Sequence, residues 1–68
     1  MLPNSFVQSL MDNQDFDFGF VIFFESDEKF TPALNFGNGV YLVQIDEFYW
    51  APCDSTKFFS ARWGVYPL

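Results

Sequence analysis

The sequence predicts one small α+β domain, in which a short N-terminal helix packs on a four-stranded antiparallel meander sheet. Apolar residues four positions apart near the N-terminus are typical of a helix, whereas residues 16–25 alternate at period two, as the residues of a strand do. Short turns separate the later apolar segments, and such turns join antiparallel strands because a parallel pair needs a long crossover. The 68 residues leave room for a single domain, residues 1–68.

The helix is expected at about residues 5–12. Ser5 and Gln8 have the spacing of a capping box, in which each side chain satisfies the other residue's free backbone N–H. A helix of two or three turns is not stable alone in water, so its apolar stripe must pack on the sheet. The stripe consists of Phe6, Val7, Leu10 and Met11.

The strand at 16–25 is expected to be central in the sheet. Its apolar face collects Phe16, Phe18, Phe20, Ile22 and Phe24. Residues 30–36 are expected to form a second strand. Because Pro32 has no N–H to donate to a neighbouring strand, this segment should lie at an edge of the sheet or at a bulge. Gly37-Asn38-Gly39 is the strongest turn signal, since Asn-Gly adopts the positive φ angles of a tight hairpin. The nearly continuous apolar segment 40–45 is expected beside 16–25, buried on both sides.

The last strand is expected at residues 57–66, which alternate again, and residues 51–55 are expected to be a loop because of their Pro, Asp and Ser content. Phe59, Ala61, Trp63 and Val65 should face one way, and Phe58, Ser60, Arg62 and Tyr66 the other. One face of the sheet then keeps large apolar side chains that no helix covers. Two copies stacked sheet to sheet would cover them, and so would a small all-β barrel, which is the alternative architecture.

The composition favours a protein that contacts another macromolecule. Half of the residues are apolar, eleven of them Phe, and nine acidic residues against three basic ones give a net charge of −6. A chain of this size buries only about 60% of the surface that its unfolded form exposes, so some rings should remain outside as a contact site. Direct binding to nucleic acid or to an anionic membrane is disfavoured by the few Lys and Arg residues.

A protein partner with a basic surface is expected instead, because complementary charge speeds the encounter and suppresses wrong partners. The acidity has an alternative interpretation, in which it only keeps a Phe-rich chain in solution. The chain shows no basic segment typical of a signal peptide, and its longest apolar run, 20–24, is too short to span a membrane. We therefore expect a cytoplasmic protein, in the host cell if the source is viral.

Catalysis, a metal and a cofactor are not expected. The chain has no His, the usual general base, and its single Cys53 can form no intrachain disulfide and is expected to be an inert thiol. Asp15-x-Asp17-x-Gly19 resembles the start of a calcium loop, but Gly19 falls where a third oxygen ligand is required. No phosphate-binding glycine loop is present, and the acids that alternate with Phe16 and Phe18 disfavour the stacking of single-stranded nucleic acid.

Partner-binding residues are expected where acids lie beside aromatic residues. The first choice is the segment 46–50, because Tyr and Trp are enriched at interface hot spots. Its alternative is that Phe48 and Trp50 belong to the core and only Tyr49 is exposed. Two further acidic segments complete the prediction. The candidate residues are Asp46, Glu47, Phe48, Tyr49, Trp50, Glu25, Asp27, Glu28, Asp15 and Asp17, with Asp12 in the same patch as the last two.

In size, acidity and lack of catalytic residues, the chain is similar to the small antagonist proteins that bacteriophages encode, such as anti-CRISPR proteins and uracil-DNA glycosylase inhibitors. The similarity is one of composition, and no motif carries it. It points to a non-enzymatic inhibitor, a nucleic-acid mimic by charge, that covers a basic or nucleic-acid-binding surface of a larger protein. The alternatives are an assembly subunit that forms a homo-oligomer, for example a homodimer, through an exposed aromatic surface of the sheet, and, last, a binder of small hydrophobic ligands.

Overall fold

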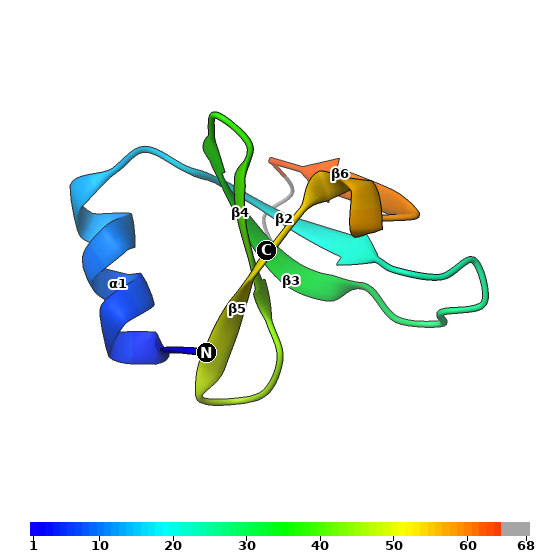
Figure 1. The fold of residues 1–68 in the computed structure, drawn as a ribbon, viewed down its shortest axis with the longest axis horizontal. Helices are drawn as coiled ribbons and strands as arrows, with labels where there is room; N and C mark the ends of the chain where they lie inside the picture. Colours follow the sequence, from blue (N-terminus) through cyan, green and yellow to red (C-terminus); the bar gives the residue numbers. More distant parts are fainter. Residues whose placement is uncertain (65–68) are drawn as a thin grey trace.

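A computed structural model describes residues 1–64, which form one helix and one open antiparallel sheet (Figure 1). The predicted α+β class is confirmed. The helix α1 spans Asn4–Asn13. The strands are β1 (Leu2–Pro3), β2 (Asp17–Ile22), β3 (Thr31–Gly37), β4 (Val40–Gln44), β5 (Tyr49–Cys53) and β6 (Ser60–Trp63), and a 3₁₀ helix, η1 (Ser55–Lys57), precedes β6.

The strand order is β1-β5-β4-β3-β2-β6, and all neighbouring pairs are antiparallel. β2 to β5 form a meander, whereas β6 returns to the other side of β2 and β1 adds to β5. The four predicted strands correspond to β2, β3, β4 and β6, whereas β1 and β5 were not predicted. Within residues 1–64 the sheet ends at β1 and β6 without closing, so the barrel alternative is wrong.

The predicted neighbours of the central strand were also partly wrong. β4 pairs with β3 and β5 and not with β2, and β3 lies inside the sheet rather than at its edge. The hairpin at 37–39 that joins β3 to β4 is confirmed, since Gly37, Asn38 and Gly39 have φ angles of 82°, 54° and 78°. A turn this short makes β3 and β4 direct neighbours, and this leaves the other side of β2 to β6.

Two prolines explain why the strand assignments went wrong. Pro32 lies in β3, but β4 pairs with β3 only from Ala33 onward, so Pro32 has a partner strand on one side alone. Pro52 lies in β5, where a loop was expected, and β1 pairs only with Tyr49 and Trp50. Proline is tolerated in both places because one side of the strand has no neighbour to which an N–H would donate.

The helix begins one residue before the expected start and is capped differently. Pro3 is extended at its N-terminus, with no hydrogen bond from a capping side chain, so the predicted capping box is wrong. The N–H of Asn4 instead donates to the carbonyl oxygen of Phe48, 2.9 Å away. Gln8 donates to Asp12 Oδ1 at 3.1 Å, one turn further along. The start of α1 is thus fixed by the turn between β4 and β5.

One core lies between α1 and the sheet. Val7, Leu34 and Leu42 are buried there. The partly buried residues around them are Leu2, Leu10, Met11, Phe16, Phe18, Phe36 and Trp50. Phe6, predicted to dock with the helix stripe, is 48% exposed instead. The helix therefore contributes three of its four predicted apolar contacts.

A second core lies on the opposite face of the sheet, which the prediction left bare. Val21, Ala33 and Val43 are buried. The residues packed on them are Phe23, Cys53, Phe58, Ala61 and Trp63. The rings of Phe58 and Trp63 also contact Tyr41, with centroids 5.5 and 5.7 Å from its own. The chain therefore covers part of this face with its own side chains.

The C-terminal strand is shorter than predicted. β6 begins at Ser60, after η1, so the alternation does not extend back through Phe58 and Phe59. Their sides are the reverse of those expected, since Phe58 packs with Trp63 and Phe59 is 57% exposed. The predicted positions of Val65 and Tyr66 lie outside the described residues. No helix within residues 1–64 is long and apolar enough to cross a membrane.

Gly19 lies in β2 directly against β6, with no space for a side chain. A Cβ at this position would lie 2.1 Å from the carbonyl oxygen of Arg62 and 2.5 Å from Cε3 of Trp63. Because the nearer atom belongs to the backbone, we expect Gly19→Ala to cost about 1–3 kcal/mol of unfolding free energy. In a domain this small, each 1 kcal/mol lowers the melting temperature by roughly 4–8 °C. Thermal unfolding followed by circular dichroism measures the shift, and an unchanged midpoint would contradict this packing.

Candidate protein-binding surface

Charged residues are divided unevenly over the molecule. We call α1, the start of β2 and the β4–β5 turn the helix side. Its acidic residues are Asp12, Asp15, Asp17, Asp46 and Glu47, and it has no Lys or Arg. All three basic residues and the other four acidic ones lie in the β2–β3 loop and from Asp54 to β6: Glu25, Asp27, Glu28, Asp54, Lys29, Lys57 and Arg62. The helix side thus carries five of the six net negative charges, since residues 65–68 have no charged side chain.

Asn4 joins the β4–β5 turn to the start of α1. Its backbone N–H donates to Phe48, and its side-chain Nδ2 donates to the carbonyl oxygen of Glu47 at 2.8 Å. The indole N–H of Trp50 donates to Asn4 Oδ1 at 2.9 Å. Asn4 therefore holds the acidic β4–β5 turn against the start of α1. Figure 1 shows the start of α1 beside the start of β5, at the lower left.

The predicted epitope at 46–50 forms this turn, and its five residues have different environments. Asp46 Oδ1 accepts from the backbone N–H groups of Phe48 and Tyr49 at 2.8 and 2.9 Å. Phe48 is 64% and Tyr49 39% exposed, so Phe48 is not in the core as the alternative required. Trp50 packs in the core under α1. Glu47, Phe48 and Tyr49 are therefore available to a partner, while Asp46 shapes the turn that presents them.

The acidic segment of the β2–β3 loop lies apart from the helix side. Asp27 Oδ2 accepts from the backbone N–H groups of Phe23 and Phe24, both at 3.0 Å, and so fixes the loop. Glu25 and Glu28 are exposed. All three share this end of the molecule with the basic residues. The structure therefore does not bring this predicted segment together with the other two.

An apolar groove opens between α1 and the sheet. Its walls come from four elements and consist of Met11, Phe16, Phe18, Leu34 and Trp50. Its volume is about 320 Å³. Sequence reasoning missed this groove because no local pattern shows that the end of a helix and β5 will face the same two strands. The apolar spacing identified each lining residue only as a core candidate.

An acidic hollow adjoins the groove. Asp15 and Asp17 line it together with Phe16, Asn35, Phe36 and Gly37, and its volume is about 220 Å³. Asn35 Oδ1 accepts from the N–H of Gly37 at 2.9 Å, which fixes its amide. The ring of Phe16 lies 5.9 Å from that of Phe36, between centroids. Phe16 lines both the hollow and the groove, so the acidic hollow and the apolar cleft meet at this residue.

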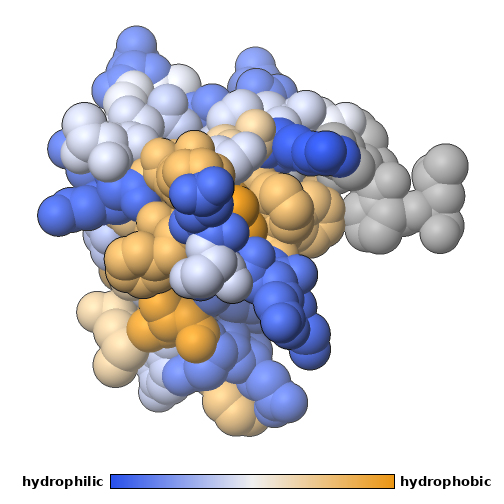
Figure 2. All heavy atoms as spheres, turned by 90° about the vertical axis from the view of Figure 1, so that its right-hand side faces the viewer, coloured by the Kyte–Doolittle hydropathy of each residue, from blue (hydrophilic) through white to orange (hydrophobic). Residues whose placement is uncertain are grey.

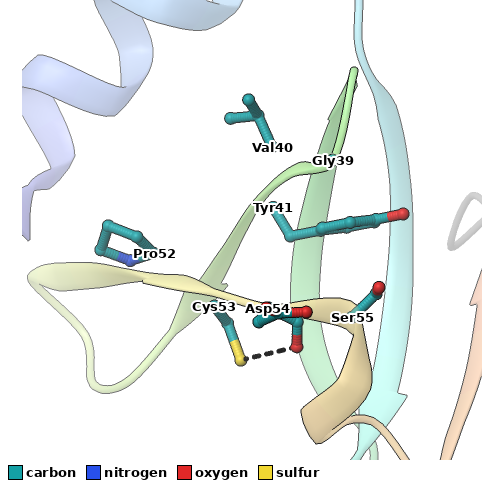
Figure 3. A pocket seen from close by; sticks show the side chains of 7 residues that line it. All are labelled: Gly39, Val40, Tyr41, Pro52, Cys53, Asp54 and Ser55. Carbon is teal, nitrogen blue, oxygen red and sulfur yellow. Dashed lines mark hydrogen bonds between the residues drawn. The ribbon is translucent and has the colours of Figure 1, made fainter.

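A third, wider hollow of about 560 Å³ contains the only thiol of the chain (Figure 3). Tyr41, Cys53 and Ser55 contribute polar atoms to it, and the Cys53 thiol donates to the carbonyl oxygen of Asp54 at 3.6 Å. Burial, and then the charge of Asp54, raise the pKa of this thiol above its ordinary value. The N–H of Thr56 donates to Asp54 Oδ1 at 3.0 Å and holds the pKa of that carboxyl below its usual range. The thiol therefore stays protonated at neutral pH, which does not suit a nucleophile.

No family model matches the chain, and no curated protein or solved structure matches it either. Within residues 1–64, no three His, Cys, Asp or Glu side chains are grouped closely enough to hold a metal ion. The function therefore has to be inferred from the charges and the exposed side chains of the helix side.

Substitutions of Asp46 separate the effect of its two hydrogen bonds on stability from the effect of its charge. Asp46→Ala removes both and should cost about 1 kcal/mol of unfolding free energy, the usual value of a side-chain cap. Asp46→Asn keeps an oxygen acceptor and should retain most of this stability, and Glu47→Gln should change stability little. Urea unfolding of the three variants measures these effects. Equal losses for Asp46→Ala and Asp46→Asn would show that the charge, and not the turn, matters.

The raised pKa of Cys53 predicts slow alkylation. At about pH 8, iodoacetamide should modify the folded protein more slowly than the protein in urea, because the thiolate is the reactive form. The folded state also holds the thiol proton more tightly than the unfolded chain, so its contribution to stability is present below the unfolded pKa and is lost as the pH rises through the folded one. Mass spectrometry against time gives both rates, and equal rates would contradict the shift.

Proposed function

We propose that the protein is a non-enzymatic binding module, an inhibitor that covers a basic, nucleic-acid-binding surface of a larger cytoplasmic protein. The uneven charge distribution supports this proposal best. The five acidic residues of the helix side have no basic side chain among them, so their field extends into solvent. A row of carboxylates can occupy a site built for phosphates, because both offer negative oxygens to Lys and Arg.

The β4–β5 turn adds apolar contact area to this charge. Phe48 and Tyr49 are exposed on a turn that hydrogen bonds to Asp46 and Asn4 hold in place. A turn that is already ordered loses less conformational entropy on binding than a flexible loop does. Aromatic rings next to Glu47 would therefore supply affinity, while the carboxylates supply steering and orientation.

The chemistry of the remaining residues agrees with a role in binding rather than catalysis. The chain lacks His, and its one thiol is protonated and donates to a backbone carbonyl. The proposal therefore includes no cofactor and no metal.

The second candidate function is assembly into a homo-oligomer, and exposed rings at the other end of the molecule favour it. Phe24, Phe30 and Phe59 are 68%, 41% and 57% exposed, and the N–H of Phe59 donates to Ile22 at 2.8 Å, close to the β2–β3 loop. Figure 2 looks onto this end and shows apolar residues gathered in its middle, with hydrophilic residues around them. If this patch joins copies, Phe24→Ser/Phe59→Ser should lower the mass measured by sedimentation.

The inhibitor proposal predicts a stoichiometric complex whose affinity falls with salt. Tagged protein should capture a nucleic-acid-binding partner from lysate of the source cells, and double-stranded DNA should displace it. Calorimetry with that purified partner should show an affinity at least about tenfold lower at roughly 200 mM than at roughly 50 mM salt, because ions screen the attraction between acids and bases.

Matched charge variants locate the surface. Asp15→Asn/Glu47→Gln removes two charges from the helix side and should weaken binding, mainly by slowing association. Glu25→Gln/Glu28→Gln removes two charges from the β2–β3 loop and should change it little. Asp46 and Asp27 stay unchanged in both because they hold turns. Equal effects of the two pairs, or an affinity that salt leaves unchanged, would overturn the proposal.

A further inference from the structure

We propose that the apolar groove and the acidic hollow together bind one short, extended segment of the basic partner. This segment carries a bulky apolar side chain, which enters the groove, and a Lys or Arg one or two residues away, which enters the hollow. The inference rests on the proposed function for the basic character of the partner. It adds the site on the helix side and the pattern that this site recognises.

The groove has the size and lining for a single large apolar side chain. All five lining residues are apolar, and about 320 Å³ is room for more than the benzene that a cavity of about 150 Å³ can hold. It also lies within the range of volumes found for ligand pockets. Met11 and Trp50 are only partly buried, so an incoming side chain would remove apolar surface from water on several sides.

The walls of the groove are held in place before any partner arrives. Leu34, in its floor, is 1% exposed, and the indole of Trp50 is fixed by its hydrogen bond to Asn4. The ring of Phe18 packs edge-on against Phe20, with centroids 5.1 Å apart. Such a cleft needs little rearrangement on binding, which preserves the free energy gained from burial.

The hollow provides the charge next to this cleft. Asp15 and Asp17 both line it, and Phe16, the residue between them, is the wall shared with the groove. A Lys or Arg can lay its methylene groups or its guanidinium plane on the Phe16 ring while its charge meets the two carboxylates. Because the two cavities share one side chain, the apolar and the basic residue of the partner must be near neighbours in an extended segment, which advances about 3.3 Å per residue.

Three synthetic peptides of about seven residues test this pattern. Each has Gly and Ser flanks around Leu-Lys-Arg, Ala-Lys-Arg or Leu-Gln-Gln. The Leu-Lys-Arg peptide should bind at least about tenfold more tightly than the Ala-Lys-Arg peptide, the effect of burying one leucine side chain. In ¹⁵N NMR titrations it should shift the amide signals of Phe16 to Phe18 and the indole N–H signal of Trp50. The Leu-Gln-Gln peptide should bind more weakly and show no salt dependence.

Variants of the helix confirm the position of the leucine. Met11→Trp fills the groove and should abolish the preference for Leu over Ala, whereas Phe6→Trp, the matched change at an exposed position of α1, should leave it intact. Asp15→Asn/Asp17→Asn should remove the preference for the basic residues. If Met11→Trp does not fold, Trp63→Phe leaves Trp50 as the only indole, and its emission should shift to the blue when the Leu-Lys-Arg peptide binds.

Several outcomes would overturn the inference. These are no binding of the Leu-Lys-Arg peptide up to millimolar concentration, equal affinities of the Leu and Ala peptides, and shifts confined to the β4–β5 turn. NMR shifts at the groove that grow with protein concentration, without peptide, would assign the groove to a second copy of the chain.

If the peptides fail to bind while the captured partner still binds with the predicted salt dependence, the groove assignment is wrong and the proposed function stands. If the peptides bind as expected while partner capture is insensitive to salt and DNA, the proposed function is wrong.

Discussion

The structure depends on covering both faces of the β2–β3–β4 ladder with a chain of 68 residues. Alternate residues of these strands are buried on opposite sides, Leu34 and Leu42 on one and Ala33 and Val43 on the other. A domain of this size has too few residues to place a full layer of helices or strands on each face of the sheet. One short segment therefore covers each face. Ten helical residues cover the first, and the segment of η1 and β6 covers the second with aromatic rings.

The surface features follow from how short these covers are. α1 is anchored at its start by Asn4 and contributes only a few side chains to the core, so it cannot enclose the rings at the start of β2. The groove is the space that remains beside Met11. Asp15 and Asp17 line the hollow that shares Phe16 with this groove, so the apolar cleft and two acidic residues lie in the same region. In a small domain, incomplete cover of the core thus leaves an apolar cleft at the surface.

Local signals in the sequence were sufficient for part of the fold. Period-two alternation identified β2, and Gly-Asn-Gly identified the β3–β4 hairpin, because each depends only on neighbouring residues. The order of the strands depends on which distant segments meet, so β6 was placed correctly as a strand but not beside β2. Pro52 concealed β5, since the composition of a segment does not show whether one side of it lacks a neighbour.

The same division applies to the surface. The sequence identified Glu47, Phe48 and Tyr49 as candidates because acids lie beside aromatic residues, but it left open whether Phe48 is exposed. The groove unites four elements and left no trace in any one stretch. The structural use of Asp46 had a signal that the prediction did not use, since Asp often accepts from the backbone two residues on in a turn.

Three of the nine acidic residues, Asp27, Asp46 and Asp54, accept hydrogen bonds from backbone N–H groups and so shape the chain locally. Substitutions that lower the negative charge without disturbing the backbone are therefore restricted to the other six acidic residues. Homologues of lower net charge should lose Asp12, Asp15 or Glu47 first and keep the three that fold the loops. A family of such chains would then vary in net charge far more than in backbone shape.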